Sequence, residues 1–237
     1  MNNLHALTRT ANGKFQSLVA VIVAASTFGW VLPANAATVV YDNGSADGSR
    51  GWWSDFDGTL QPFQQIADGF VLGAGSNTIS GVNWSGSYYS TNTPTAADNF
   101  VIRIFGDSGG VPDVNPIYSF NVGNAVNRMD SGIDDATWNI DIYNYSAAIT
   151  STTLVAGTSY WLSVVNDTTG STDDWLWENS QPVGSSAFRL GDGNGWGSHG
   201  TELAFQITAV PEPEVYVMLL AGLGLFGFMA RSRKNNA

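Results

Sequence analysis

Three short segments of the chain combine tryptophan with acidic or amide side chains, and this combination can bind sugars. They are residues 52–58, 173–178 and 191–196. An indole ring offers a flat apolar surface on which the apolar face of a pyranose stacks, while carboxylates accept hydrogen bonds from its hydroxyl groups. The sequence therefore predicts carbohydrate binding, and the candidate residues are Trp52, Trp53, Asp55, Asp57, Trp175, Trp177 and Trp196.

A second interpretation of the same segments remains open. Tryptophan is mostly buried in folded proteins, so each indole can equally fill the core beneath a loop while the neighbouring acids stay in water. Alternation along an extended chain would place Trp175 and Trp177 on the same face. The pattern alone does not distinguish a binding platform from a core.

Paired aspartates in two of these segments also suggest a metal. Asp55 with Asp57, and Asp173 with Asp174, supply the hard oxygen ligands that Ca²⁺ prefers. The twelve-residue Asp-x-Asp-x-Asp-Gly loop that ends in glutamate is absent from the sequence. Calcium is therefore the one cofactor that the sequence suggests, and the alternative is that there is none and the charges keep the protein soluble.

The residues that hydrolysis requires are scarce. Between residues 37 and 210 the only histidine is His199, which excludes a two-histidine metal site and is the one histidine that a Ser-His-Asp triad could use. The chain has no cysteine, hence no disulfide and no thiol nucleophile. Glycoside hydrolysis needs two carboxylates across a cleft, and no spacing singles out a pair. We expect a protein that is not an enzyme, with a polysaccharide-acting hydrolase as the alternative.

Charge and composition of the central region point to an acidic all-β domain. Residues 37–210 contain four arginines, no lysine and eighteen acidic residues, which gives a formal charge of −14. This charge excludes nucleic acid as a partner, because phosphates require basic residues. Sixteen of the acids are aspartate, which together with abundant glycine favours turns over helices.

Alternating polar and apolar residues predict the strands of this domain. The clearest segments are 38–41, 66–72, 79–84, 100–105, 117–122, 138–143, 160–165, 187–190 and 203–207. Their number and their glycine- and aspartate-rich connections predict a two-sheet antiparallel sandwich, jelly-roll-like, over residues 37–209. In such folds the first and last strands often pair, which would bring the two ends of the domain together.

Targeting segments flank the predicted domain. Arg9 and Lys14 precede an apolar stretch over residues 15–32, and Ala34-Asn35-Ala36 follows. These are the three parts of a secretory signal peptide, so we expect a signal peptidase to cleave after Ala36 and remove residues 1–36.

The C-terminal segment is a second apolar stretch. Residues 215–230 are uncharged, and a helix of this length spans about 24 Å, somewhat less than the hydrocarbon core of a bilayer. Arg231, Arg233 and Lys234 follow directly and would keep that end in the cytoplasm. We therefore predict a transmembrane helix over residues 215–230 and a basic cluster over residues 231–234.

The residues before this helix carry a family resemblance. Val210 is followed by Pro211-Glu212-Pro213, then by the apolar helix and by Arg231-Ser232-Arg233-Lys234. Over residues 210–237 this arrangement closely resembles the PEP-CTERM sorting signal of bacterial surface proteins. The resemblance implies recognition by an exosortase, a membrane-embedded cysteine transpeptidase, and cleavage near residues 211–213.

The resemblance also implies where the protein goes. It would pass transiently through the inner membrane and then reach the cell surface or an exopolysaccharide matrix such as that of a biofilm. We expect a structural or adhesive role there, with exopolysaccharide as a partner, and a permanently membrane-anchored protein is the alternative. A further segment, Asp107-Ser108-Gly109-Gly110-Val111-Pro112, resembles a strand-to-turn pattern of bacterial extracellular β-sandwiches of unassigned activity. Its glycines are expected to adopt positive φ.

Overall fold

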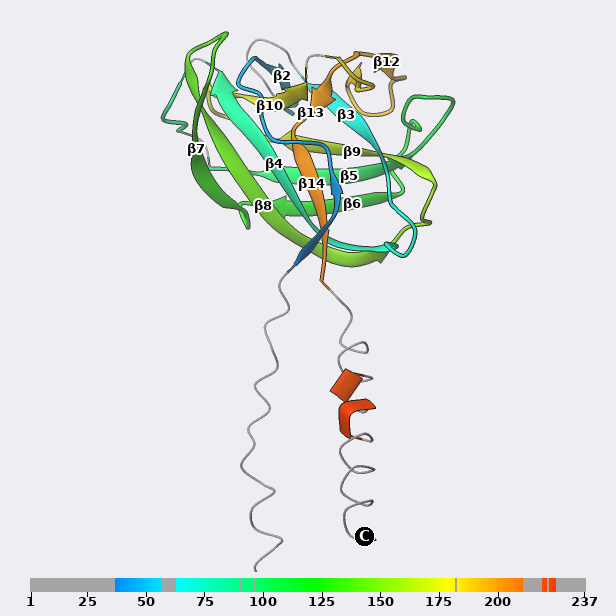
Figure 1. The fold of residues 1–237 in the computed structure, drawn as a ribbon. Coiled ribbons are helices and arrows are strands. Elements are labelled where there is room, and N and C mark those ends of the chain that lie inside the picture. The colour runs from blue at the N-terminus through cyan, green and yellow to red at the C-terminus, as the bar shows by residue number, and fades with distance from the viewer. Residues whose placement is uncertain are drawn as a thin grey trace, which may run out of the picture. The chain divides into compact units, whose positions relative to one another are not determined.

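The computed structural model of the protein describes residues 37–56, 63–89, 91–95, 97–181, 183–210, 219–220 and 222–224. Within the described residues of 37–210 the regular elements are all strands (Figure 1). The strands are β1 (Thr38–Asp42), β2 (Gly51–Trp53), β3 (Gln64–Val71), β4 (Thr78–Tyr89), β5 (Phe100–Gly106), β6 (Tyr118–Gly123), β7 (Asn127–Asp135), β8 (Ile140–Thr153), β9 (Ser159–Asn166), β10 (Asp174–Gln181), β11 (Ala187–Leu190), β12 (Gly197–Ser198), β13 (Glu202–Leu203) and β14 (Phe205–Ala209).

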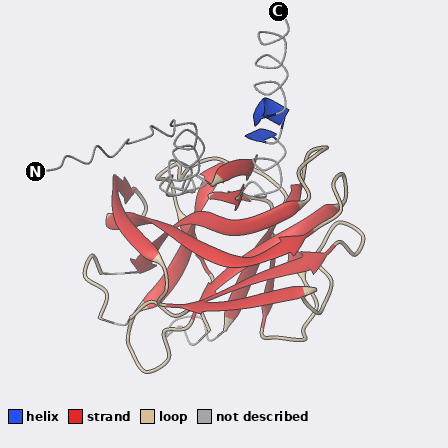
Figure 2. Cartoon of the chain, turned by 90° about the horizontal axis from the view of Figure 1, so that it is seen from below, coloured by secondary structure: helices blue, strands red, loops and turns tan. Residues whose placement is uncertain are grey.

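The strands build two antiparallel sheets that face each other as layers (Figure 2). The larger sheet has the path β1-β14-β4-β10-β13, with β8 beside β4, β7 beside β8 and β2 beside β10. The smaller sheet has the order β12-β11-β3-β9-β5-β6. The predicted all-β sandwich of two antiparallel sheets is therefore confirmed.

Strand β4 organises the larger sheet because it is long enough to pair with three others. One of its edges pairs with β14 through residues 81–84 and then with β10 through residues 86–89. Its other edge pairs with β8 along most of its length. Side chains alternate across this strand, so Val82 and Trp84 enter the core while Asn83 faces outward half-buried.

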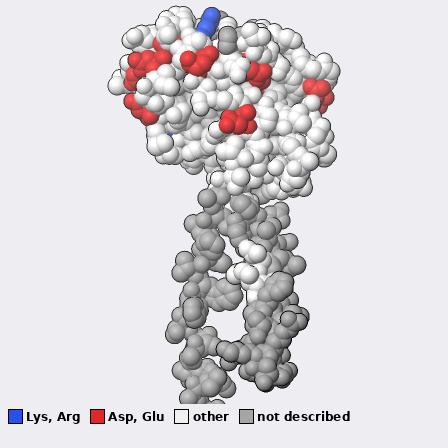
Figure 3. All heavy atoms as spheres, in the orientation of Figure 1, with Lys and Arg blue, Asp and Glu red and all other residues white. Residues whose placement is uncertain are grey.

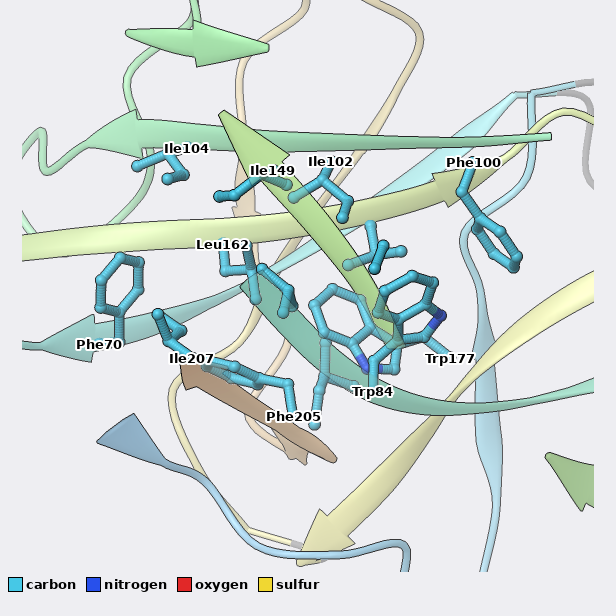
Figure 4. Close-up of a cluster of buried hydrophobic side chains, with 14 of the residues drawn as sticks. Phe70, Trp84, Phe100, Ile102, Ile104, Ile149, Leu162, Trp177, Phe205 and Ile207 are labelled. Carbon is cyan, nitrogen blue, oxygen red and sulfur yellow. The ribbon is translucent and has the colours of Figure 1, made fainter. Parts of the chain in front are cut away.

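The core lies between the two layers and is rich in aromatic rings (Figure 4). Trp84 stacks on Tyr145 from β8 with the ring centroids 5.5 Å apart. Phe100 from the smaller sheet packs edge-on against both Trp84 and Trp175, at 5.1 Å and 5.0 Å. Such edge-to-face contacts are the arrangement that aromatic quadrupoles favour, so the two sheets are joined by directional as well as apolar contacts.

The strand predictions were incomplete in the acidic and asparagine-rich regions. No strand was predicted for β7, whose apolar residues are few, for residues 52–53, which lie in β2, or for residues 174–178, which lie in β10. The predicted strand 138–143 begins at Ile140 instead, because Asn139 has a φ of 54° and belongs to the turn before β8. The expected turn at Asp107 is confirmed, with φ values of 72° and 88° at Gly109 and Gly110.

The two ends of the domain lie side by side. Strand β1 pairs with β14 in an antiparallel register that joins Thr38 to Ala209. This confirms the predicted pairing of first and last strands. The amide of Val210 then donates a hydrogen bond to the Ser80 hydroxyl at 2.8 Å, so the chain is still attached to β4 where the predicted sorting segment begins.

Several predictions fall on residues outside the described ranges. They concern Ala34 and Ala36 of the signal peptide, Asp57, the Pro211-Glu212-Pro213 motif, and Arg231, Arg233 and Lys234. Of the predicted helix 215–230, the described residues 219–220 and 222–224 are helical. In the described part of the chain, no helix has both the length and the apolar character needed to cross a bilayer.

The packing of Trp175 predicts a strong effect of a one-carbon change in β4. A Cβ at Gly86 would lie 2.8 Å from the Leu176 carbonyl oxygen and would overlap the Trp175 ring. We expect Gly86→Ala to lower the free energy of unfolding by about 1–3 kcal/mol, since a well-packed core cannot admit the methyl group without shifting. At about 2–4 °C per kcal/mol for a domain of this size, the fall in Tm is measurable by differential scanning fluorimetry.

Gly73→Ala is the matched control for this substitution. Nothing lies within 4 Å of a Cβ built at Gly73, and its φ is not positive. We expect its Tm to stay within about 2 °C of the parent, in line with surface substitutions that touch no special feature. Equal Tm values for the two variants would show that the Trp175 ring does not occupy the space beside Gly86.

Candidate functional site

The structure brings two of the three tryptophan-rich segments together, but as paired strands rather than as loops. In the register between β2 and β10, Trp52 is opposite Trp177 and Trp53 is opposite Leu176. Opposite residues on paired strands share a face, so the pairing also fixes which rings enter the core.

Trp175 and Trp177 are core residues. Both are 0% exposed, and the indole N–H of Trp177 donates to the Ala204 carbonyl at 3.0 Å. Neither ring has a face that a sugar could reach. The prediction of ligand binding at these two positions is wrong, and the alternative of a buried core holds for them.

Trp52 and Trp53 keep part of their surface exposed, but their rings already have partners. The Arg50 guanidinium lies over the Trp52 ring at 4.1 Å, and the His199 imidazole meets it edge-on with the centroids 3.9 Å apart. Burial and the nearby Arg50 charge lower the pKa of His199. Trp53 lies 6.0 Å from the ring of Tyr89.

The aspartates of the predicted calcium site hold backbone and hydroxyl groups in place. Asp55 is fully buried, and its carboxylate accepts hydrogen bonds from the Trp175 amide at 2.7 Å and the Thr168 hydroxyl at 2.8 Å. Asp173 accepts the Thr95 amide at 2.7 Å, and Asp174 is also buried. Among the described residues, no three His, Asp or Glu side chains are placed to hold a metal ion. Asp57 lies outside those residues.

Two arginines hold the third segment, residues 191–196, in place. Asp192 pairs with Arg103 at 2.6 Å and with Arg189 at 2.7 Å, and the Arg189 guanidinium lies 4.6 Å from the centre of the Trp196 ring. The Trp196 indole N–H donates to the Asp113 carbonyl at 3.0 Å. Trp196 therefore covers the outer side of the smaller sheet and stays partly exposed, so sugar binding at this position remains a prediction.

A different surface carries free hydrogen-bonding groups, on the outer side of the larger sheet. It is built by two rows of uncharged side chains that cross neighbouring strands in register. We call it the amide face, and its members are Asn83 and Ser85 of β4, Asn127 and Met129 of β7, Asn144 and Ser146 of β8, and Gln206 of β14.

The rows of the amide face follow directly from strand pairing. Across the sheet Gln206 is opposite Asn83, Asn83 is opposite Ser146, and Ser146 is opposite Asn127. In the second row Ser85 is opposite Asn144, which is opposite Met129. Together with Gly44 and Ser45 these residues line a hollow of about 390 Å³.

The hydrogen bonds within the amide face leave several of its side-chain donors and acceptors without a partner among the described residues. The Asn83 amide donates to Gln206 Oε1 at 3.3 Å, and the Ser85 hydroxyl donates to Asn144 Oδ1 at 2.9 Å. Within the described part of the chain, the side chains of Asn127 and Ser146 make no hydrogen bond, and the Asn144 amide N–H groups have no acceptor. A ligand in the hollow would therefore meet both donors and acceptors.

The surroundings of this face are acidic while the face itself is neutral. Figure 3 views the molecule from the side on which Figure 1 places β4, β8 and β14, and shows acidic groups separated by wide uncharged areas with almost no basic atoms. Asp42 lies at the margin, where it accepts a hydrogen bond from Gln206 Nε2 at 3.1 Å. This face was not predicted from the sequence. The pattern that could have indicated it is the alternation of asparagine and serine with buried rings in residues 83–87 and 143–147.

A buried glutamate lies within β10 of the same sheet, opposite Gly51 of β2. Glu178 is 0% exposed and accepts a hydrogen bond from the Ser87 hydroxyl, while its second oxygen has no donor among the described residues. Burial raises the pKa of Glu178 to about 8, and the charges of Asp135 and Asp47 add to the rise. Its carboxyl group is therefore largely protonated at neutral pH.

Comparison with known proteins gives one match, at the C-terminal end. Residues 209–234 match the PEP-CTERM protein-sorting motif, a range that includes Pro211-Glu212-Pro213 and the basic cluster. No curated protein and no solved structure has significant similarity to the chain. The chain thus carries the sorting signal of an exported surface protein, an exosortase is its processing partner, and the folded domain has no assigned activity.

The raised pKa of Glu178 predicts a pH-dependent stability with a definite sign. The unfolded chain loses this proton near pH 4.5 and the folded chain near pH 8, so the unfolded state binds fewer protons between these values. The free energy of unfolding should therefore decrease as the pH rises from 4.5 to 8. We expect Glu178→Gln to flatten this decrease in urea denaturation measured at pH 5, 6.5 and 8.

The control for Glu178→Gln is Asp134→Asn, which removes an exposed carboxylate from the β7–β8 hairpin. It should leave the slope of stability against pH unchanged. An identical slope in the parent and in Glu178→Gln would show that Glu178 is ionised in the folded protein at neutral pH.

Proposed function

Starting from its sorting motif, we propose that this protein is a non-catalytic component of the cell surface or extracellular matrix whose amide face binds a neutral polysaccharide. The observation that carries the proposal is the hollow of about 390 Å³ lined by uncharged amide and hydroxyl side chains in register across four strands. An adhesive role in the matrix follows from such binding.

The chemistry of the amide face favours sugar hydroxyl groups. Asparagine and glutamine each present a donor and an acceptor on one planar group, which matches hydroxyl groups that both donate and accept. A neutral polysaccharide would meet no electrostatic repulsion as it approaches the protein. The formal charge of −14 over residues 37–210 would instead repel an anionic polymer. The free groups of Asn127, Asn144 and Ser146 lie where a chain crossing β8 would meet them.

The alternative of a hydrolase has less support from the described residues. The carboxyl groups whose pKa is raised enough to act as an acid at neutral pH are those of Asp68 and Glu178. Both side chains are 0% exposed, so a polysaccharide could not reach them.

The export route completes the proposal. Signal peptidase would cleave after Ala36, and the helix over residues 215–230 would hold the chain transiently in the inner membrane. The exosortase would then cleave near Pro211-Glu212-Pro213, which directly follows the end of β14. The folded domain would leave the membrane without its hydrophobic tail and enter the matrix.

Removing two amides from the hollow tests the binding proposal. We expect Asn127→Ala combined with Asn144→Ala to weaken retention on cellulose or dextran about tenfold or more, because each lost hydrogen bond to a ligand is worth about 1 kcal/mol. Retention of the parent should not change between 50 and 500 mM NaCl, since no ion pair is involved. The measurement is a pull-down isotherm with processed protein from the exporting host.

The matched control removes two exposed amides from the other sheet. Asn115→Ala combined with Asn121→Ala alters the loop before β6 and β6 itself, which belong to the smaller sheet and contribute no residue to the hollow. This variant should bind as the parent does. Equal retention of both double variants would refute the amide face as the binding site, and preferential retention on alginate would refute a neutral ligand.

Replacing the sorting motif tests the route separately from ligand binding. Changing Pro211-Glu212-Pro213 to three alanines should leave full-length protein in the membrane fraction, because the Pro-Glu-Pro sequence of the matched sorting motif is lost. Mass spectrometry of the membrane and culture fractions measures this. Recovery of Ala237 in the released parent protein would contradict processing and would favour a permanent membrane anchor.

A further inference from the structure

One strand edge of the sandwich is open and carries no charge. Strand β6 is the last strand of the smaller sheet, and among the described residues it pairs on one side only, with β5 (Figure 1). Every second residue of such an edge strand presents its backbone N–H and C=O groups outward, where another strand can bind them. The smaller sheet can therefore be extended at β6.

The other edge strands have features that oppose such pairing. Strand β7 carries four charged residues, and its register is interrupted between Asp130 and Asp134. Strand β1 has a register shift between Val39 and Tyr41, and β2, β12 and β13 have only two or three residues each. Charges, bulges and short length are the means by which natural proteins keep edge strands from pairing with other chains.

Strand β6 lacks these protective features over most of its length. Residues 118–121 pair with β5 in an unbroken register, and the one shift lies beside Gly123. Residues 114–127 contain no charged side chain, although residues 37–210 have a formal charge of −14. Most of the surface would therefore repel a second copy of the chain, while this edge would not.

Exposed apolar side chains adjoin the same edge. Val114, Ile117 and Tyr118 are 44%, 47% and 38% exposed. The Tyr118 ring lies 6.3 Å from the Phe120 ring, with the two planes within 14° of parallel, and Phe120 packs against the main core. A contiguous group of exposed apolar residues is typical of a surface that another protein covers.

We propose that β6 pairs with β6 of a second copy of this chain, antiparallel about a two-fold axis, so that the two smaller sheets join into one. Addition of a strand to an open sheet edge is a common mode of protein recognition, because the backbone itself supplies the hydrogen bonds. A two-fold axis gives both copies the same contacts and closes the assembly as a dimer.

The sequence of β6 is complementary to itself in this arrangement. When Phe120 is opposite Phe120 of the partner subunit, Tyr118 is opposite Val122 of the partner subunit on the same face. On the other face Ser119 is opposite Asn121 of the partner subunit. Aromatic and apolar residues thus meet each other, and two hydrogen-bonding side chains meet each other, which are the cross-strand pairs that stabilise sheets.

The absence of charge favours a second copy over a basic partner. A basic protein would be attracted to the acidic surface elsewhere on the domain and would gain no electrostatic energy at β6. Two acidic copies can approach each other closely only where both are neutral. A single strand pair is smaller than the interface of about 1,200–2,000 Å² typical of stable complexes, so we expect a weak dimer.

Sedimentation equilibrium of the processed protein tests the proposal, which does not depend on the amide face. We expect the apparent mass to rise from that of the monomer at about 1 µM towards twice that value at about 500 µM, as a small interface predicts. Raising NaCl from about 50 to about 500 mM should strengthen the association several-fold, because salt screens the repulsion between two acidic copies. A protein that stays monomeric at the highest concentration in both salts would overturn the proposal.

Added charge at the edge should prevent the association. Ser119→Asp combined with Asn121→Asp would place carboxylates directly opposite each other across the strand pair, and we expect it to weaken dimerisation at least tenfold. The matched control, Ala74→Asp combined with Asn77→Asp, adds the same charge at exposed positions between β3 and β4 and should associate as the parent does. Thermal unfolding of both variants checks that the fold is retained.

Cysteine cross-linking reads the contact directly, because the chain contains no cysteine of its own. Opposite Cα atoms of an antiparallel pair are about 4.5–5.5 Å apart, a distance that a disulfide can span. Under mild oxidation, a mixture of Ser119→Cys and Asn121→Cys proteins should form disulfide-linked dimers. Met129→Cys, on the exposed edge strand β7, is the control and should form none.

The pattern of cross-links decides between the possible contacts. A disulfide in the mixture supports pairing centred on Phe120, and a disulfide in either protein alone supports the same edge with the centre moved by one residue. No disulfide at 119 or 121 would overturn the proposal, as would a dimer that persists in the folded Ser119→Asp, Asn121→Asp variant. A disulfide formed by Met129→Cys alone would identify β7 as the paired edge instead.

Discussion

The filling of the space between two sheets by indole and phenyl rings is the constraint from which the other features follow. Trp84, Trp175 and Trp177 meet Phe100 and Phe205 there (Figure 4). Because side chains alternate along a strand, each ring that enters the core places its neighbours on the outside. In β4 and β8 those neighbours are asparagine and serine, so the same alternation that builds the core aligns the amide face. Alternate residues of the same strands therefore form the core on one side of the sheet and the candidate site on the other.

The acidic charge of the domain is distributed in two different ways. Many aspartates lie at the surface, where they disfavour aggregation and anionic partners. Asp55, Asp68 and Glu178 are instead fully buried, and Asp55 and Asp68 accept hydrogen bonds from the backbone amides of Trp175 and Leu203. Asp68, for example, accepts the Leu203 amide at 2.6 Å and so fixes β13 against β3. Burial of such groups costs free energy unless they are hydrogen-bonded, which explains why most of their oxygens have donors.

The sequence was sufficient for the fold class and for most strands, because alternation reports burial on one face. It failed at β7, where Met129 and Ile133 are exposed and the pattern carries little apolar signal. It also failed for the tryptophans, because ring stacking on a sugar and ring packing in a core require the same residue. Trp196 is the clearest example. Its position depends on the Arg189 guanidinium and on the Asp113 backbone carbonyl, and neither contact can be recognised from the residues around Trp196. The amide face depends on the register of four strands, and a single sequence does not reveal register.

The place of β14 connects the candidate site to the sorting motif. This strand contributes Gln206 to the amide face and ends at Ala209, where the matched motif begins. It lies between β1 and β4 and is hydrogen-bonded to both. A force between a bound polymer and an attachment at the C-terminal end of the domain would therefore act along β14. To move, the strand would have to break its hydrogen bonds to β1 and to β4 together rather than one after another. An edge strand in that position would be bonded on one side only. The topology thus favours a domain that withstands tension applied at its C-terminal end, a property that the proposed adhesive role would require.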